Sequence, residues 1–177
     1  MLKKSGTTSG NMTRWITIVM GLSVLMLAVG LLLFNMGILG LSERNVMADV
    51  KAKLSAEGAD PGEMQYMTSQ GETLFAVLAY PEDRAGCTYY LYVNRPGFDF
   101  GWHFESSAPL GSGITLAETE ASGAAWLSAN AEGEIASVTY ADGTGRDLKG
   151  YPLVDTAGEL HLFNAQGEEI AALDTAG

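Results

Sequence analysis

A run of 27 residues without a single charge, residues 15–41, constrains the folding of this chain more than any other feature. It reads WITIVMGLSVLMLAVGLLLFNMGILGL. A helix of roughly 20 such residues is long enough to cross the ~30 Å hydrocarbon core of a bilayer, and it satisfies its own backbone polar groups there. In water the same side chains would aggregate. Residues 15–41 are therefore predicted to form a transmembrane helix that partners the lipid bilayer.

The alternative interpretation of this run is a signal peptide that is removed. The apolar core of a signal peptide spans roughly 7–15 residues, which is much shorter than the run observed here. The sequence Val46-Met47-Ala48 matches a small-x-small cleavage site poorly, and Cys87 lies too far away to be a lipid attachment site. We therefore expect an anchor that stays uncleaved.

Charge is divided unevenly between the two sides of this run. Residues 1–14 hold three basic residues and no acid, whereas residues 42–177 hold seven basic and 21 acidic residues, a net charge of −14. Arg44, Lys51 and Lys53 follow the run closely, so the Lys and Arg counts of the two flanks are nearly equal. A long domain is translocated largely regardless of its charge. We predict a cytoplasmic tail over residues 1–14 and an extracytoplasmic C-terminal domain in a single-pass protein of the cell membrane.

Residues 42–61 are predicted to form a juxtamembrane helical stalk and linker. Apolar side chains recur at helical spacing on one face: Met47, Val50 and Leu54. Gly58 is a typical C-cap, so we expect the membrane helix to continue as one rod to about Glu57. Two roles remain open for the apolar stripe. It packs on its own domain or the lipid headgroups, or it forms the seam of a parallel homodimer.

Residues 62–177 change from helical to alternating periodicity, which predicts β-strands. Residues 74–80, LFAVLAY, are apolar on both faces and are typical of a buried central strand. Residues 87–94 form a second alternating segment. After a turn, four aromatic side chains share one strand face, which we expect to be core: Phe98, Phe100, Trp102 and Phe104.

Three segments near the C-terminus share the pattern Asx, two residues, Gly, Glu: residues 130–134, 155–159 and 164–168. Asx at the first position and Gly at the fourth favour a type I turn. The expected strands around these turns are residues 125–129, 135–140, 152–155, 160–165 and 169–173. Many short strands at this spacing predict an antiparallel β-sandwich or partly closed barrel over residues 62–177.

In layout, residues 124–173 resemble the extracytoplasmic β-sandwich domains of uncharacterised membrane-anchored proteins of Gram-positive bacteria. The resemblance rests on residues 124–127 (AAWL), on residues 134–140 (EIASVTY) leading into Asp142-Gly143-Thr144, and on residues 160–167 (LHLFNAQG). It implies an extracytoplasmic location and a mainly-β fold. It implies no activity and transfers no catalytic residue.

Five residues are candidates for a partner surface: Tyr90, Tyr92, Asp99, His103 and Glu105. The last three are expected on one face of a strand, where neighbours lie ~6.6 Å apart, and one strand cannot close three ligands around zinc. This favours a solvated polar face. The two tyrosines share the face opposite Tyr89 and Leu91. They form an exposed aromatic patch for a partner or glycan if that face is uncovered, or they lie under the loop of residues 81–87.

Nothing in the sequence points to catalysis or to a cofactor. There is no GxSxG or HExxH motif, and residues 111–113, GSG, lack the Lys-Ser/Thr of a phosphate loop. Residues 142–147, DGTGRD, lack the full pattern of a calcium loop and favour a salt-bridged turn. Cys87 is expected to pack as a small apolar side chain. The acidic balance argues against a nucleic-acid partner, because phosphate binding requires a basic face.

These observations predict a membrane-anchored protein that displays a small acidic β domain. We expect a non-enzymatic binding or accessory module for an envelope or membrane protein, without cofactors or metals. The alternative is an extracytoplasmic domain that senses a ligand or an ion.

Overall fold

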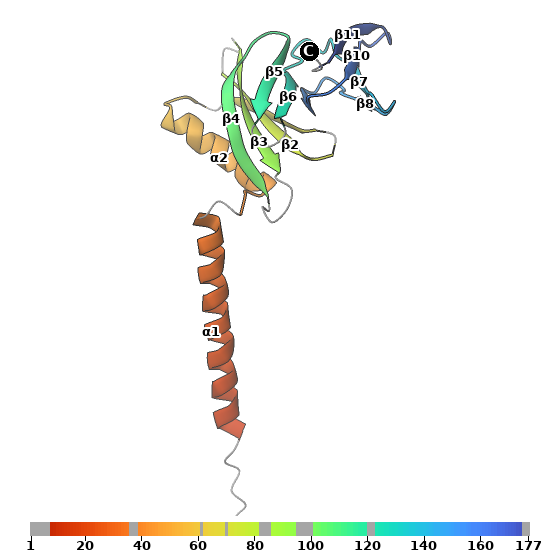
Figure 1. Ribbon diagram of the computed structural model, residues 1–177. Helices are drawn as coiled ribbons and strands as arrows, with labels where there is room; N and C mark the ends of the chain where they lie inside the picture. Colours follow the sequence, from red (N-terminus) through yellow and green to blue (C-terminus); the bar gives the residue numbers. More distant parts are fainter. Residues whose placement is uncertain are drawn as a thin grey trace, which may run out of the picture. The chain divides into compact units, whose positions relative to one another are not determined.

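The computed structural model of the protein describes residues 8–35, 39–60, 62–69, 71–81, 86–94, 101–119 and 123–174. The chain divides into two compact units, Met1–Leu39 and Gly40–Gly177. Each unit is described by itself. The first contains one long helix, and the second contains one short helix and all the strands (Figure 1).

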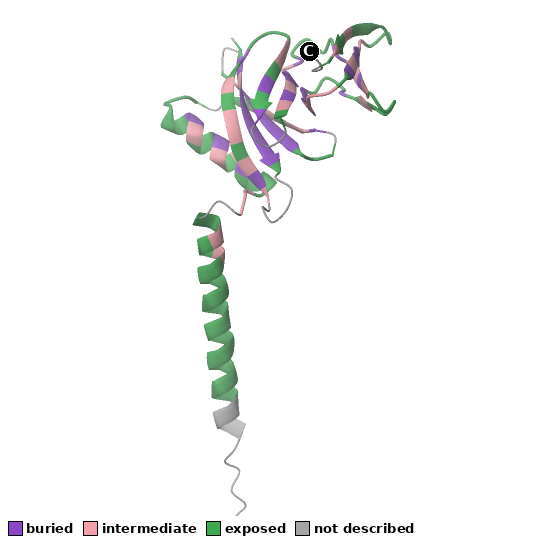
Figure 2. Ribbon diagram, in the orientation of Figure 1, coloured by how far each residue is buried: buried purple, intermediate pink, exposed green. Residues whose placement is uncertain are grey.

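The first unit is built around helix α1, Thr8–Asn35. Its segment Met12–Asn35 is long and apolar enough to cross a membrane, either as an anchor or as a signal sequence. Almost all of its side chains are exposed, including Leu25, Leu27 and Leu31 (Figure 2). The hydroxyls of Thr17 and Ser23 donate to carbonyls one turn earlier in the same helix, so their polar groups are satisfied internally.

The second unit begins at Gly40, next to a residue in a β-bridge. Leu41 forms an isolated antiparallel bridge with Trp102, with N–O distances of 2.7 and 2.8 Å in the two backbone hydrogen bonds. A Cβ atom on Gly40 would lie 2.6 Å from the carbonyl carbon of Gly101, so only glycine permits this approach. The prediction of one continuous rod to Glu57 is therefore wrong, because extended backbone around Leu41 separates the two helices.

Helix α2, Glu43–Ala56, belongs to the second unit, so the predicted stalk is part of the β domain. Its buried stripe is Val46, Val50 and Leu54. These side chains pack in one cluster with the aromatic residues Phe75, Tyr90, Tyr92 and Trp102. The apolar stripe of α2 therefore packs on its own domain. The seam proposed for a homodimer is already occupied.

The strands form three antiparallel sheets, none of them closed. The first has the order β1-β2-β3-β4, with β1 Glu63–Thr68, β2 Leu74–Tyr80, β3 Cys87–Asn94 and β4 Trp102–Leu110. The second has the order β5-β6-β9, with β5 Ile114–Thr119, β6 Gly123–Ser128 and β9 Leu153–Thr156. The third has the order β11-β10-β7-β8, with β7 Ser137–Tyr140, β8 Gly145–Asp147, β10 Leu160–Phe163 and β11 Glu169–Leu173.

The first sheet is covered on both faces, which explains why β2 is apolar throughout (Figure 2). One face carries Phe75, Val77 and Tyr92 under α2. The other carries Leu74 and Leu91, which pack with residues of the second sheet. The predicted buried strand over residues 74–80 and the mainly-β antiparallel domain are confirmed.

The predicted turns are correct in two of three places. The N–H of Gly133 donates to the carbonyl of Asn130, and the N–H of Gly167 donates to that of Asn164. Both glycines have positive φ, as the pattern requires. Asp155 differs, because it lies within β9 and its side chain is buried.

Candidate functional site

The structure corrects the predicted partner surface at Tyr90 and Tyr92. Their exposed fractions are 1% and 0%, so neither residue contributes to an aromatic surface patch. The cover is α2, because both rings pack in the cluster that contains Val46 and Val50. Sequence periodicity showed an apolar stripe on this helix but not the sheet face that it covers.

Contacts between polar groups fasten α2 over this face. The Tyr92 hydroxyl donates to Asp49 Oδ2 at 2.6 Å, and Lys53 Nζ lies 3.3 Å from the same oxygen. Lys53 also lies 4.4 Å from the centre of the Phe104 ring, which meets Tyr92 edge to face. Burial, with the Asp49 hydrogen bond next, raises the pKa of Tyr92 far above its usual range. The phenol is therefore a permanent donor that holds the helix on the sheet.

The remaining predicted residues are not gathered on one polar face. Asp99 lies outside the described residues. The pairing of β3 with β4 shifts by one residue. Tyr92 pairs with Phe104, whereas the preceding residue, Leu91, pairs with Ser106. Glu105 is the extra residue of this bulge, which breaks the alternation that placed it beside His103. His103 pairs with Val93, and its Nε2 atom is buried without a hydrogen-bond partner in the part of the chain that the structure describes.

A hollow of about 320 Å³ lies where the strands of the first sheet end, and sequence reasoning missed it. The register pairs Glu63 with Tyr80 and Cys87 with Leu110, and all four residues line the hollow. Gly111 also lines it and leaves open space, since a Cβ there would meet nothing within 4 Å. Ends of strands far apart in sequence thus create the space.

A second hollow of about 510 Å³ adjoins the first. It is lined by Ile114 at the start of β5, by Ile135, and by Ile170 of the edge strand β11. The two hollows share four lining residues: Ser112, Ala129, Asn130 and Ala131. We refer to the two adjoining hollows together as the groove.

Asn130 fixes the wall between the two hollows. Its Nδ2 donates to the carbonyls of Ile135 at 2.9 Å and Tyr151 at 3.1 Å, and its Oδ1 accepts from the Ile135 N–H at 3.0 Å. Its φ of 46° lies in the left-handed region, which Asn adopts more readily than most residues. The Asn130 side chain is buried and its amide forms three hydrogen bonds, which hold this residue in place between the two hollows.

The groove is acidic at its rim. Glu63, Glu132 and Glu134 line it and are exposed, and none of the described lining residues is Lys, Arg or His. Burial raises the pKa of the Cys87 thiol, so this side chain stays protonated and is a poor nucleophile. The groove thus combines exposed carboxylates with apolar side chains.

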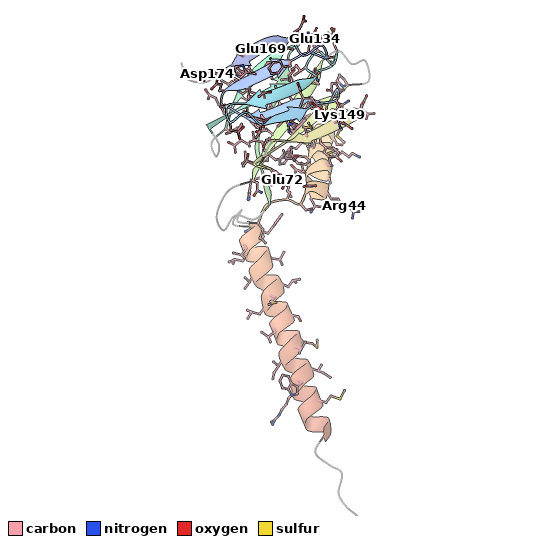
Figure 3. All side chains as sticks on the ribbon, turned by 90° about the vertical axis from the view of Figure 1, so that its right-hand side faces the viewer. Arg44, Glu72, Glu134, Lys149, Glu169 and Asp174 are labelled. Atoms are coloured by element: carbon pink, nitrogen blue, oxygen red, sulfur yellow. The ribbon has the colours of Figure 1, made fainter. Side chains whose placement is uncertain are left out.

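The groove lies at the end of the first sheet opposite to the point where the chain enters the domain. Asn94, the last residue of β3, pairs with Trp102, which bridges to Leu41. Cys87 is the first residue of β3, and a strand of this length covers roughly 23 Å. Figure 3 shows Glu134 at the far end of the domain from Arg44 at the start of α2.

A second polar cluster ties the three sheets together. The Arg146 guanidinium of β8 lies 2.8 Å from Asp155 Oδ2 of β9 and donates to the carbonyl of Thr68 in β1 at 2.9 Å. The Tyr140 hydroxyl donates to the same Asp155 oxygen at 2.8 Å. Burial and this hydrogen bond raise the pKa of Tyr140. The sequence indicated a salt-bridged turn at Arg146, but the ion pair joins two sheets instead, and its role is structural.

His161 lies between two glutamates on the surface of the third sheet. Its Nδ1 is 2.8 Å from Glu169 Oε1 and its Nε2 is 3.2 Å from Glu159 Oε1. These carboxylates take different ring nitrogens, so they cannot join the imidazole around one ion. Across the described ranges no group of three or more His, Cys, Asp or Glu side chains is placed to hold a metal.

Comparisons with protein-family models, curated proteins and solved structures found no match to this chain. The resemblance of residues 124–173 to membrane-anchored sandwich domains therefore stays a prediction. The groove is assigned as the candidate site from its geometry.

Proposed function

We propose that this chain is a single-pass membrane protein whose acidic β domain is a non-enzymatic binding module for another envelope or membrane protein. The groove is the proposed binding site. The observation that carries the proposal is the position of the groove, at the end of the domain opposite to the entry of the chain at Leu41. A domain arranged in this way holds its binding site at the far end of the first sheet from the point where the chain enters it.

The anchoring role is supported by the surface of α1. Its Leu, Ile and Val side chains are exposed on all sides, and between Trp15 and Asn35 the helix carries no charge. Lipid is the solvent that such a surface requires. The basic tail of residues 1–14 and the long acidic domain together support a cytoplasmic N-terminus and an extracytoplasmic C-terminal domain.

The length of the connection supports a partner close to the membrane. Five peptide steps separate Asn35 at the end of α1 from Gly40 at the start of the second unit, which is at most about 18 Å. This length limits how far the start of the domain can be from the end of α1. Tethering raises the effective concentration for a partner confined to the same membrane.

Photocrosslinking in the native membrane tests this proposal. A photoreactive amino acid is placed at Ser112 or Ala131 in the groove and, as a control, at Ala48 on the exposed side of α2. We expect both groove positions to trap the same membrane or envelope protein, identified by mass spectrometry, and Ala48 not to trap it. Absence of a common adduct, or the same adduct from all three positions, contradicts the proposal.

The sensing alternative has one observation in its favour. The first hollow, of about 320 Å³, falls at the lower end of the size range of small-molecule sites, and Gln65 and Tyr80 supply polar groups to it. A specific ion or ligand raises the melting temperature by mass action. An increase for the full-length protein in calcium or zinc, abolished by Glu63→Gln, would favour sensing over partner binding.

A further inference from the structure

We infer that the segment bound by the groove is an extended cationic peptide in which Lys or Arg alternates with apolar residues. This inference rests on the proposed function and names the chemistry of its partner. It is carried by the charge of the rim, the apolar side chains of the wall and the strand edge beside them.

The charge of the rim selects a cationic ligand. Glu63 lies on the first hollow, and Glu132 and Glu134 lie on the second. All three side chains are exposed, so a cation can reach them directly from solvent. Glu63 already accepts a hydrogen bond from Gln65 Nε2 at 3.2 Å, which orients its carboxylate. An acidic ligand would meet repulsion along the whole length of the groove.

The wall of the groove selects apolar side chains between the cations. Ile170 is 45% exposed although it lines the second hollow, and Ile114 is half-buried beside it. Leu110 lines the first hollow. Covering Ile170 and Ile114 removes apolar surface from water, which a purely polar ligand does less well, whereas Leu110 is already buried.

The edge strand β11 favours an extended conformation. In the described part of the chain, β10 is its only strand partner, so its outer backbone groups face away from the sheet. A peptide that adds to such an edge gains main-chain hydrogen bonds. Its side chains then alternate in direction, so residues at every second position share one face of the sheet and can pack together on the isoleucine wall.

Peptide binding to the full-length protein in phosphatidylcholine nanodiscs tests the inference. The probes are three fluorescently labelled hexapeptides: Lys-Val-Lys-Val-Lys-Val, Lys-Ser-Lys-Ser-Lys-Ser and Glu-Val-Glu-Val-Glu-Val. Fluorescence anisotropy reports binding. We expect saturable binding of the Lys-Val peptide that is at least about tenfold tighter than that of either other peptide.

Two triple variants with the same net charge separate the groove from the overall field of the domain. Glu63→Gln with Glu132→Gln and Glu134→Gln should weaken binding of the Lys-Val peptide at least about tenfold. The control, Glu43→Gln with Glu72→Gln and Glu118→Gln, removes three exposed charges outside the groove and should leave the affinity within about twofold of the wild type. Ile170→Ser should weaken the Lys-Val peptide but not the Lys-Ser peptide.

Three results would overturn the inference: no saturable binding of the Lys-Val peptide, equal weakening by both triple variants, or equal affinity for the Lys-Ser peptide. Its failure is distinguishable from failure of the proposed function. A partner trapped from Ala131 in the native membrane, together with no peptide binding, rejects the peptide chemistry alone. Absence of that adduct rejects the groove as a partner site, whatever the peptides do.

Discussion

The guanidinium of Arg146 lies 2.8 Å from the carboxylate of Asp155, whose side chain is only 2% exposed. A buried charge pair thus joins the third sheet to the second, and Arg146 also bonds to a carbonyl of the first sheet at Thr68. Buried ion pairs are costly to form but far more costly to break, since a lone charge is left without water or a partner. This contact links all three sheets, so we expect its loss to destabilise the β domain.

Arg146→Met should lower the free energy of unfolding by about 3–5 kcal/mol, because the buried Asp155 carboxylate loses its cation and keeps only uncharged partners such as the Tyr140 hydroxyl. Urea unfolding followed by tryptophan fluorescence measures this loss. Lys149→Met is the matched control, since this nearby cation is exposed and makes no salt bridge within the described residues. The double variant Arg146→Met with Asp155→Leu should be more stable than Arg146→Met alone. Unchanged stability in the single variant contradicts the argument.

Tyr92→Phe should loosen α2 by about 1 kcal/mol, because the hydrogen bond to a partly exposed Asp49 is lost while the ring stays buried. Amide hydrogen exchange of Glu43–Ala56 measures the effect locally. Tyr66→Phe is the control, since Tyr66 is exposed and lies on β1. Faster exchange over α2 in both variants alike would argue against a specific role for the Asp49 contact.

The third sheet should be more stable below neutral pH than above it. The hydrogen bonds to Glu169 and then Glu159 raise the pKa of His161 above its ordinary value. A raised pKa in the folded state means that protonation stabilises the fold, and this contribution is lost as the pH rises through the folded-state pKa. NMR titration of the His161 ring and amide exchange of β11 measure the two effects. Glu169→Gln should lower the pKa of His161, and a pKa at or below the ordinary value contradicts the prediction.

Gly40→Ala should break the bridge between Leu41 and Trp102, since the new Cβ would lie 2.6 Å from the backbone of Gly101. Overpacking of this kind costs about 1–3 kcal/mol. Faster amide exchange at Leu41 and faster proteolysis of the connection to α1 are the expected readouts. Gly158→Ala is the control, because a Cβ there meets nothing within 4 Å. Equal protection of Leu41 in the Gly40→Ala protein and the wild type would count against the close approach.

A reporter enzyme fused after Gly177 should be active outside the cytoplasm, because the acidic domain is proposed to be extracytoplasmic. The control is a fusion before Met1, which should show the opposite behaviour. A C-terminal reporter that works only in the cytoplasm would reverse the proposed orientation.

Local signals in the sequence were sufficient for the parts of the fold that depend on neighbouring residues. The uncharged run predicted α1, although the helix ends at Asn35 and not at residue 41, and the two-sided apolar segment predicted β2. The turns at Asn130 and Asn164 also followed from local chemistry. Each of these features is encoded within a few consecutive residues.

Features that depend on distant residues were not predictable in this way. The cover over Tyr90 and Tyr92 comes from a helix about 40 residues away, and the bulge at Glu105 shifts a regular alternation. Asp155 has the sequence context of a turn residue, but in the structure its side chain is buried and forms an ion pair with Arg146. The groove combines ends of strands from different sheets, and no local pattern specifies which strands are neighbours.

The positions of Leu41 and the groove at opposite ends of the first sheet have a mechanical consequence. Under the proposed function, a pull on a partner in the groove would be transmitted to Leu41 along the length of β3 and its neighbours. The hydrogen bonds between antiparallel strands run perpendicular to this direction, so they carry the load together, in shear, instead of opening one after another. In the proposed arrangement, the first sheet would therefore resist tension between its two ends.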